Sequence, residues 1–163
     1  MTSASSTVSE TPDRAAKRGN LIYIFIALLS LGGLADAIYL AVEHITGQSA
    51  KCTIIAGCSE VLSSSYAVVA GYPLAAIGAV AYFSVFSLAI LAVFGYRVAG
   101  LLLVPLILVM FLMSLWLIYL QAFVIGAFCQ YCLLSAGITF AMTGLALAWW
   151  SVRKRSEEGG RQK

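Results

Sequence analysis

The sequence predicts an all-α, polytopic membrane protein: a four-transmembrane-helix bundle with a short extracytoplasmic half-helix in the loop between helices 1 and 2. Three observations predict this fold. The 163 residues are 61% hydrophobic. Only 10% are charged, against about 25% in soluble domains, which is too few to cover a water-facing surface. Four apolar runs lie near 20–42, 72–94, 99–122 and 129–150, and each is long enough to cross about 30 Å of hydrocarbon as a helix.

The apolar runs are predicted to be helices because backbone groups inside lipid must be satisfied within the protein. None of them shows the alternation of a membrane barrel strand. Asp36 is the single charged residue in the first run, and the other three hold none. The first run is too long for a signal peptide and no small-residue cleavage site follows it, so it is interpreted as a permanent anchor.

The segments outside the apolar runs predict a single membrane domain with two tails. Residues 1–19 are rich in Ser, Thr, Ala and charge, a composition typical of a disordered cytoplasmic tail. Residues 151–163 are expected to form a second, basic cytoplasmic tail. Residues 20–150 then form the four-helix membrane domain, which is expected to be catalytic.

The distribution of Lys and Arg predicts the orientation. Four helices place both termini on one side of the membrane, and that side also holds the 95–98 turn. It collects nine of the ten basic residues, Arg14, Lys17, Arg18, Arg97, Arg153, Lys154, Arg155, Arg161 and Lys163. Lys51 is alone on the other side. Because basic residues stay in the cytoplasm, the 43–71 loop and the 123–128 turn are expected outside the plasma (inner) membrane of a bacterium.

This orientation places all four cysteines outside, in the compartment where disulfides persist. Cys52 and Cys58 lie in the long outer loop, and Cys129 and Cys132 lie at the outer end of the fourth helix. Four cysteines allow three pairings, and spacing does not choose among them. The two close pairs favour two dithiol/disulfide couples over one static framework.

The motif Cys129-Gln130-Tyr131-Cys132 is the sharpest signal in the chain. Its spacing places both sulfurs on one face of the first turn of a helix, where the helix dipole and exposed N–H groups favour a reactive thiolate. Two other interpretations are a structural zinc site, which needs four ligands, and inert membrane cysteines. An oxidising exterior and the five-residue spacer between Cys52 and Cys58 argue against a metal.

The loop pair is interpreted as a thiol shuttle, because Gly57 softens the chain next to Cys58 and disulfide exchange needs a thiolate that reaches its target sulfur. The alternative is a static, loop-closing disulfide. Residues 59–66, with Cys58 at their start, are expected to form the half-helix over the mouth of the bundle.

Asp36 lies in the first helix, about two turns below the outer surface, where a carboxyl group is costly and therefore a candidate functional group. It is a candidate for proton transfer to a reduced acceptor, or else a hydrogen-bonded packing residue. Ser30, Gly33 and Asp36 share one helix face, which is expected to point into the bundle. His44, where this helix leaves the membrane, is either a solvated side chain or a proton-exchange group.

The order of these motifs resembles the bacterial form of the vitamin K epoxide reductase family. A membrane helix precedes a loop with two cysteines, then Cys58-Ser59-x-Val61-x-Ser63-Ser64, Gly71-x-Pro73, two more helices, and Phe128-Cys129-x-Tyr131-Cys132 heading the last helix. The resemblance covers roughly residues 20–150. The four-cysteine layout in a four-helix frame is specific, whereas a CxxC motif alone is not.

The resemblance implies a thiol:quinone oxidoreductase that supports disulfide bond formation. It implies that Cys132 reduces a quinone (menaquinone or ubiquinone), that Cys129 exchanges with Cys58, and that Cys52 meets a thioredoxin-fold partner. Ser64 matches a family serine near the quinone and is expected, with Asp36 and Cys132, to contact it. Bacterial members reoxidise a secreted DsbA-like protein and pass two electrons to the membrane quinone pool.

The sequence departs from the family pattern in two places. Many bacterial relatives carry a fused thioredoxin-like domain; none follows the fourth helix here, so a separate partner is expected. The asparagine and tyrosine with which animal members hold vitamin K are not evident, and the second falls at Ala136. Two other functions remain as alternatives, a metal-binding or metal-transporting membrane protein that uses the four cysteines and a four-helix scaffold with static disulfides. No nucleic-acid-binding motif is present.

Overall fold

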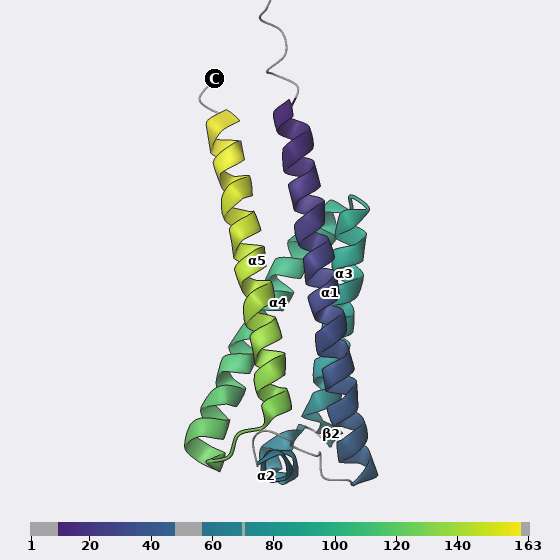
Figure 1. The fold of residues 1–163 in the computed structure, drawn as a ribbon, viewed down its shortest axis with the longest axis vertical. Coiled ribbons are helices and arrows are strands. Elements are labelled where there is room, and N and C mark those ends of the chain that lie inside the picture. Colours follow the sequence, from purple (N-terminus) through teal and green to yellow (C-terminus); the bar gives the residue numbers. More distant parts are fainter. Residues whose placement is uncertain (1–9, 48–56, 70, 161–163) are drawn as a thin grey trace, which may run out of the picture.

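The computed structural model describes residues 10–47, 57–69 and 71–160. Within them, four long helices run side by side (Figure 1). These are α1 (Glu10–Thr46), α3 (Leu74–Val93), α4 (Arg97–Tyr119) and α5 (Gln130–Gly160). The shorter elements are α2 (Cys58–Ser63), the 3-10 helix η1 (Ser65–Ala67), the strands β1 (Val68–Val69) and β2 (Tyr72–Pro73), and the π-helix η2 (Leu120–Ile125).

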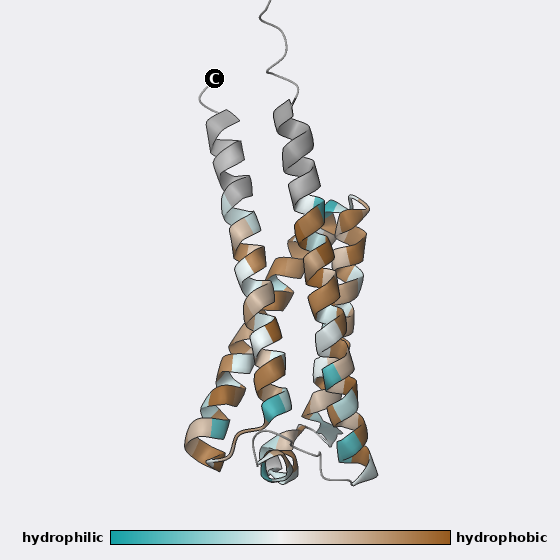
Figure 2. Cartoon of the chain, viewed as in Figure 1, coloured by the Kyte–Doolittle hydropathy of each residue, from teal (hydrophilic) through white to brown (hydrophobic). Residues whose placement is uncertain are grey.

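Four stretches of the described chain are long and apolar enough to cross a membrane, which confirms the predicted four-helix membrane fold. They are Gly19–Thr46, Leu74–Val93, Arg97–Ile125 and Gln130–Ser151. Figure 2 shows hydrophobic residues throughout the coloured parts of all four helices. Many of these side chains face outward, as expected where the surrounding solvent is lipid instead of water.

The ends of the chain differ from the sequence-based expectation. Helix α1 begins at Glu10 and α5 continues to Gly160, so helical backbone covers residues 10–19, where disorder was predicted, and most of 151–163. Pro12 falls in the first turn of α1, where its missing N–H leaves no bond unmade. Both helices extend beyond the α3–α4 connection at the same end of the bundle (Figure 1). We call this the tail end.

The core of the bundle lies between α1, α3, α4 and α5. Its fully buried side chains come from all four helices and include Ile26, Val85, Leu103, Ile107 and Met142. Helix α1 packs most extensively against α3. At the centre of that contact a side chain on Gly33 would collide with the ring of Tyr82, so only glycine fits there. Ser30, Gly33 and Asp36 are all buried, as expected for the inward face of α1.

The opposite end, which carries Cys58, Cys129 and Cys132, we call the cysteine end. Helix α2 lies across it (Figure 1), which confirms the predicted half-helix. The chain then makes an antiparallel β1–β2 pair, with Val68 opposite Pro73 and Val69 opposite Tyr72. Gly71 has a positive φ of 85° in the connecting turn, which favours glycine. The pair returns the chain to Leu74, where α3 begins.

Candidate functional site

The CxxC motif lies at the start of α5. The carbonyl of Cys129 accepts a hydrogen bond from the Leu133 N–H at 3.0 Å, so Cys129 caps the helix and Cys132 falls in its first turn. Both are free thiols. Cys129 is fully buried, whereas Cys132 is partly exposed. The two sulfurs of one motif therefore meet different surroundings.

A π-helix supports this motif from the preceding segment. Within η2 the side chain of Gln121 turns inward and is only 2% exposed. Its Oε1 accepts the Cys129 N–H at 2.9 Å. The chain then turns at Gly126, which has a φ of 69°, and leads into Cys129. Gln121 thus binds a backbone donor that the first turn of α5 leaves without a helical partner.

Cys58 packs directly against this arrangement. It is 1% exposed and lies in one buried cluster with Leu40 and Cys129. Gly57 makes the close approach possible: a side-chain carbon there would lie 2.8 Å from the Phe128 carbonyl oxygen, and its φ is 154°. The loop backbone therefore rests on the backbone just before Cys129, which places the second loop cysteine beside the first cysteine of the CxxC.

The oxidation states of the three described cysteines differ. Cys58 is disulfide-bonded, and since Cys129 and Cys132 are free thiols, neither is its partner. Cys52, the first loop cysteine, lies in 48–56, outside the described residues.

The two free thiols share a hydrogen bond that separates their protonation. The Cys132 thiol donates to the Cys129 sulfur and, against the opposing effect of burial, lowers the pKa of Cys129 to about 7. Backbone hydrogen bonds from Cys132 and Tyr131 contribute in the same direction. Cys129 is thus the group that ionises near neutral pH, while Cys132 supplies the proton of the hydrogen bond.

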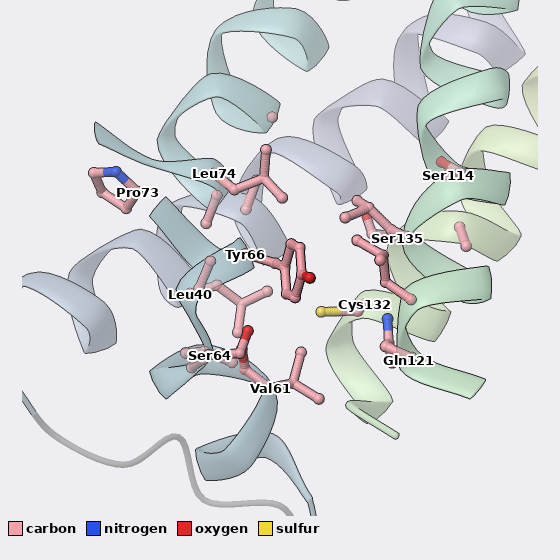
Figure 3. A pocket seen from close by; sticks show the side chains of 18 of the residues that line it. Leu40, Val61, Ser64, Tyr66, Pro73, Leu74, Ser114, Gln121, Cys132 and Ser135 are labelled. Atoms are coloured by element: carbon pink, nitrogen blue, oxygen red, sulfur yellow. The ribbon is translucent and has the colours of Figure 1, made fainter. Parts of the chain in front are cut away.

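A cavity of about 150 Å³ opens at the cysteine end, between α1, α3, α4 and α5 and under α2 and η1. Cys132 lines it and Cys129 does not. Figure 3 shows the Cys132 sulfur pointing toward the ring of Tyr66, with Gln121 beside it. Most of the lining is apolar, and its apolar residues include Leu40, Val61, Leu62, Leu74, Leu117, Ile118 and Ala136.

A few polar side chains also reach the cavity. Asp36 lines it from α1, and its Oδ2 is buried with no hydrogen-bond partner in the described part of the chain. Ser64 lines it from the end of α2, but its hydroxyl donates to the Val61 carbonyl at 2.7 Å. Ser64 would have to turn away from Val61 to donate to a ligand. His44 lines the same cavity nearer the end of α1.

The structure therefore brings together Asp36, Ser64 and Cys132 around one cavity, and Cys58 and Cys129 beside it. Sequence reasoning missed two residues here. Gln121 is a polar side chain inside a membrane-spanning stretch, which is a usable functional signal. Tyr66 belongs to the short 3-10 helix η1, which is too short to show a hydrophobic periodicity in the sequence.

The metal alternative gains no support from the donor set. Among the described residues no group of three or more His, Cys, Asp or Glu side chains is arranged to hold an ion. The Cys58 sulfur is engaged in a disulfide and is not a thiolate ligand in this state.

Comparison with protein families identifies a match over most of the chain. The model of the vitamin K epoxide reductase family matches residues 24–147 of the chain. This range runs from the first turns of the membrane-spanning part of α1 to the last turns of that part of α5. All four cysteines, the cavity and the π-helix fall inside it.

Proposed function

Because the chain belongs to the vitamin K epoxide reductase family, and is thus a membrane oxidoreductase, we propose that it is a thiol:quinone oxidoreductase supporting disulfide bond formation. It reoxidises a separate, secreted DsbA-like thioredoxin-fold protein and passes two electrons to a membrane quinone, either menaquinone or ubiquinone. One observation carries the proposal: Cys132 opens on an apolar cavity while Cys129, three residues earlier, packs against Cys58.

The packing supports a fixed order of thiol exchange. The partner's dithiol reduces the Cys52–Cys58 disulfide. The Cys58 thiolate then attacks Cys129 in an oxidised CxxC and releases Cys132, and Cys52 attacks Cys58, which re-forms the loop disulfide and releases Cys129. Two electrons have moved inward at the end of this exchange. A bonded Cys58 beside two free CxxC thiols corresponds to that end state.

The size and the apolar lining of the cavity support the binding of a quinone ring. A quinone accepts two electrons and two protons and is soluble in lipid. An apolar cavity of about 150 Å³ is large enough for a benzene-sized ring. Polar groups are few, as in ligand pockets generally, and the buried Asp36 oxygen lacks a partner. Ala136 lines the wall where a tyrosine would hold vitamin K, which favours plain quinone reduction over epoxide reduction.

The same reasoning assigns the cysteine end to the outside of a bacterial plasma membrane, since the basic residues gather at the tail end. Residues 20–150 are the catalytic membrane domain, and 1–19 and 151–163 are cytoplasmic. An impermeant maleimide added to intact, briefly reduced cells should block the loop thiols. Labelling that required cell lysis would reverse the assignment.

The test is quinone reduction by the full chain in detergent, supplied with a reduced thioredoxin-fold dithiol protein and followed by quinone absorbance. The wild type should turn over and Cys132→Ala should not. In Cys129→Ala, Cys132 still faces the cavity but cannot pass its oxidation on, so turnover should also stop. Equal rates in wild type and Cys132→Ala, in folded protein, would refute the proposed function.

The loop couple is tested separately with two reductants. Cys52→Ala should spare turnover with a small dithiol that reaches the CxxC directly and should impair turnover with the protein partner. Equal impairment with both reductants would contradict the shuttle role of Cys52.

A further inference from the structure

The described neighbours of Asp36 leave one oxygen of its carboxyl group without a hydrogen-bond partner. It lies on the buried face of α1 and is only 9% exposed. The nearest polar network engages other groups, because the Tyr82 hydroxyl donates to the Ser135 carbonyl at 2.8 Å and lies 3.0 Å from the Thr139 hydroxyl. Asp36 Oδ2 has no partner among the described residues and lines the cavity that Cys132 faces. A buried polar atom with no partner is costly unless a ligand engages it.

The two CxxC thiols carry fewer protons than the reduction of a quinone requires. Reducing a quinone to a hydroquinone takes two electrons and two protons. Oxidising Cys129 and Cys132 to a disulfide yields both electrons, but the pKa of Cys129 is lowered to about 7. On average the pair therefore brings about one and a half protons at pH 7 and little more than one at pH 8. Another group at the cavity must supply the second.

We propose that Asp36 is the catalytic acid that gives the second proton to the quinone, and that His44 returns a proton to it from water at the cysteine end. This inference rests on the proposed function. The step balances: the Cys129 thiolate, the Cys132 thiol, the Asp36 carboxylic acid and the quinone become a Cys129–Cys132 disulfide, an Asp36 carboxylate and a hydroquinone. The carboxylate then regains the proton that the partner's thiols released to water.

The absence of a positively charged neighbour in the described part of the chain favours the protonated form of Asp36. No Lys or Arg occurs among the described residues that line the cavity. The titratable groups beside Asp36 are Tyr82 of α3 and the thiols of Cys129 and Cys132 at the start of α5, and His44 of α1 and Tyr66 of η1 line the same cavity. Helix α4 and η2 contribute Ser114 and Gln121, which do not titrate. A carboxyl group in apolar surroundings with no cationic partner is held neutral.

Asp36 and His44 lie on the same face of α1, which leads from the cavity toward the water at the cysteine end. Asp36, Leu40 and His44 are four residues apart, so they follow one another along α1, and all three line the same cavity. His44 is half-buried in the last turns of the helix. Histidine exchanges protons readily near neutral pH, which suits a group between the cavity and water.

The first experiment compares Asp36→Asn, Asp36→Glu and the wild type in quinone reduction between pH 6 and 8.5. The control is Ser30→Ala, which changes a buried polar residue on the same helix face, away from the cavity, whose hydroxyl donates to the Ala27 carbonyl. Asp36→Asn should lose about a hundredfold in rate at neutral pH. Its rate should fall about tenfold for each unit of rising pH, because water must then supply the proton. Asp36→Glu should keep the wild-type pH profile, and Ser30→Ala should match the wild type.

The second measurement needs no quinone. Infrared difference spectra of the full chain at pH 7 should show a protonated carboxyl band that Asp36→Asn removes and Ser30→Ala keeps. The other Asp and Glu side chains lie outside the apolar runs and are the same in all three proteins, so the difference between wild type and Asp36→Asn isolates Asp36.

Three results would overturn the proposal: a wild-type pH profile in folded Asp36→Asn, an Asn-like profile in folded Asp36→Glu, or no such band in the wild type. Each leaves the proposed function standing if Cys132→Ala is inactive. A Cys132→Ala variant that turns over would instead overturn the proposed function itself.

Discussion

The two ends of the bundle are built differently. Toward the tail end, regular helices pack around fully buried apolar side chains such as Ile26 and Ile107, and the Trp149 indole N–H donates to the Tyr23 hydroxyl at 3.0 Å. At the cysteine end the backbone is a series of short pieces: α2, η1, the β1–β2 pair and the π-helix η2. The cavity that Cys132 lines lies at this end.

This difference shows how a small membrane protein accommodates a reactive site. Irregular backbone at membrane depth is tolerated where it is covered by protein or lines a cavity, and π-helices occur often at functional sites. The regular half holds the helices together, and the irregular half positions three sulfurs. Substitutions in the irregular half should therefore change activity, and substitutions in the regular half should change stability.

Gly57→Ala should give the largest effect on activity without removing a reacting group. Its new carbon would lie 2.8 Å from the Phe128 carbonyl oxygen, so the loop must move and Cys58 must shift away from Cys129. Because a displacement of about 1 Å can cost about a hundredfold in rate, we expect a loss of that order in turnover driven by the protein partner. Quinone reduction by a small dithiol should change little.

The matched control is Gly47→Ala. Gly47 also has a positive φ, 66°, but a side chain there meets nothing within 4 Å. Both variants carry backbone strain, so equal losses of turnover in the two would show that the contact with Phe128 is not what matters.

Ile107→Ala tests the other end. Ile107 is fully buried in the regular core, and its truncation should cost about 2 kcal/mol of stability, roughly a thirtyfold change in the unfolding equilibrium. The specific activity of this variant below the unfolding temperature should stay at the wild-type value, because Ile107 does not line the cavity. Thermal unfolding in detergent measures the first quantity, and quinone reduction per folded molecule the second.

A lipid-facing control, Leu101→Ala, should leave both quantities near the wild-type values, since Leu101 is 64% exposed. If Ile107→Ala lowered the specific activity as strongly as Gly57→Ala, the division of the molecule into two functional halves would be wrong.

The regular half is also the half that the sequence predicts well. A long apolar run can cross a bilayer only as a helix, so the four observed spans begin and end within a few residues of the predicted ones. The half-helix was predictable because Cys58 begins a short segment with an apolar side, and it is observed as α2. The start of α1 at Glu10 was not predicted. The polar composition of residues 10–18 does not indicate a helix, although the membrane-spanning helix continues through them.

The irregular half was predicted only in outline. Asp36 stands out in the sequence as the one charge in an apolar run, and it lies at the cavity. Gln121 was missed as a contact of Cys129, because reaching that N–H requires a π-helix and a turn at Gly126, and neither has a periodic signature. The burial of Cys58 depends on contact between segments 71 residues apart, Gly57 with Phe128 and Cys58 with Cys129, which no local pattern encodes.

Gln121→Leu tests that missed contact. It removes the acceptor of the Cys129 N–H bond, 2.9 Å long, and leaves a buried donor unsatisfied, at a cost of about 1–3 kcal/mol. With the start of α5 less well held, partner-driven turnover should fall about tenfold. Gln121→Glu keeps an acceptor oxygen at the same reach and should recover part of the loss; identical rates in both variants would show that the hydrogen bond does not position Cys129.

The smallest predicted effect is a pH dependence within the cysteine end. The hydrogen bond from Cys132 lowers the pKa of Cys129 to about 7, so its thiolate form is present above that pH and is lost as the pH falls through it. Thiolate absorbance of the CxxC dithiol, with the loop disulfide intact, should therefore fall about twofold between pH 8 and pH 7. In Cys132→Ala the donor is gone and the midpoint should rise, while Cys129→Ala should show no transition in this range. A midpoint above pH 8 in the wild type would show that the hydrogen bond from Cys132 does not stabilise the Cys129 thiolate.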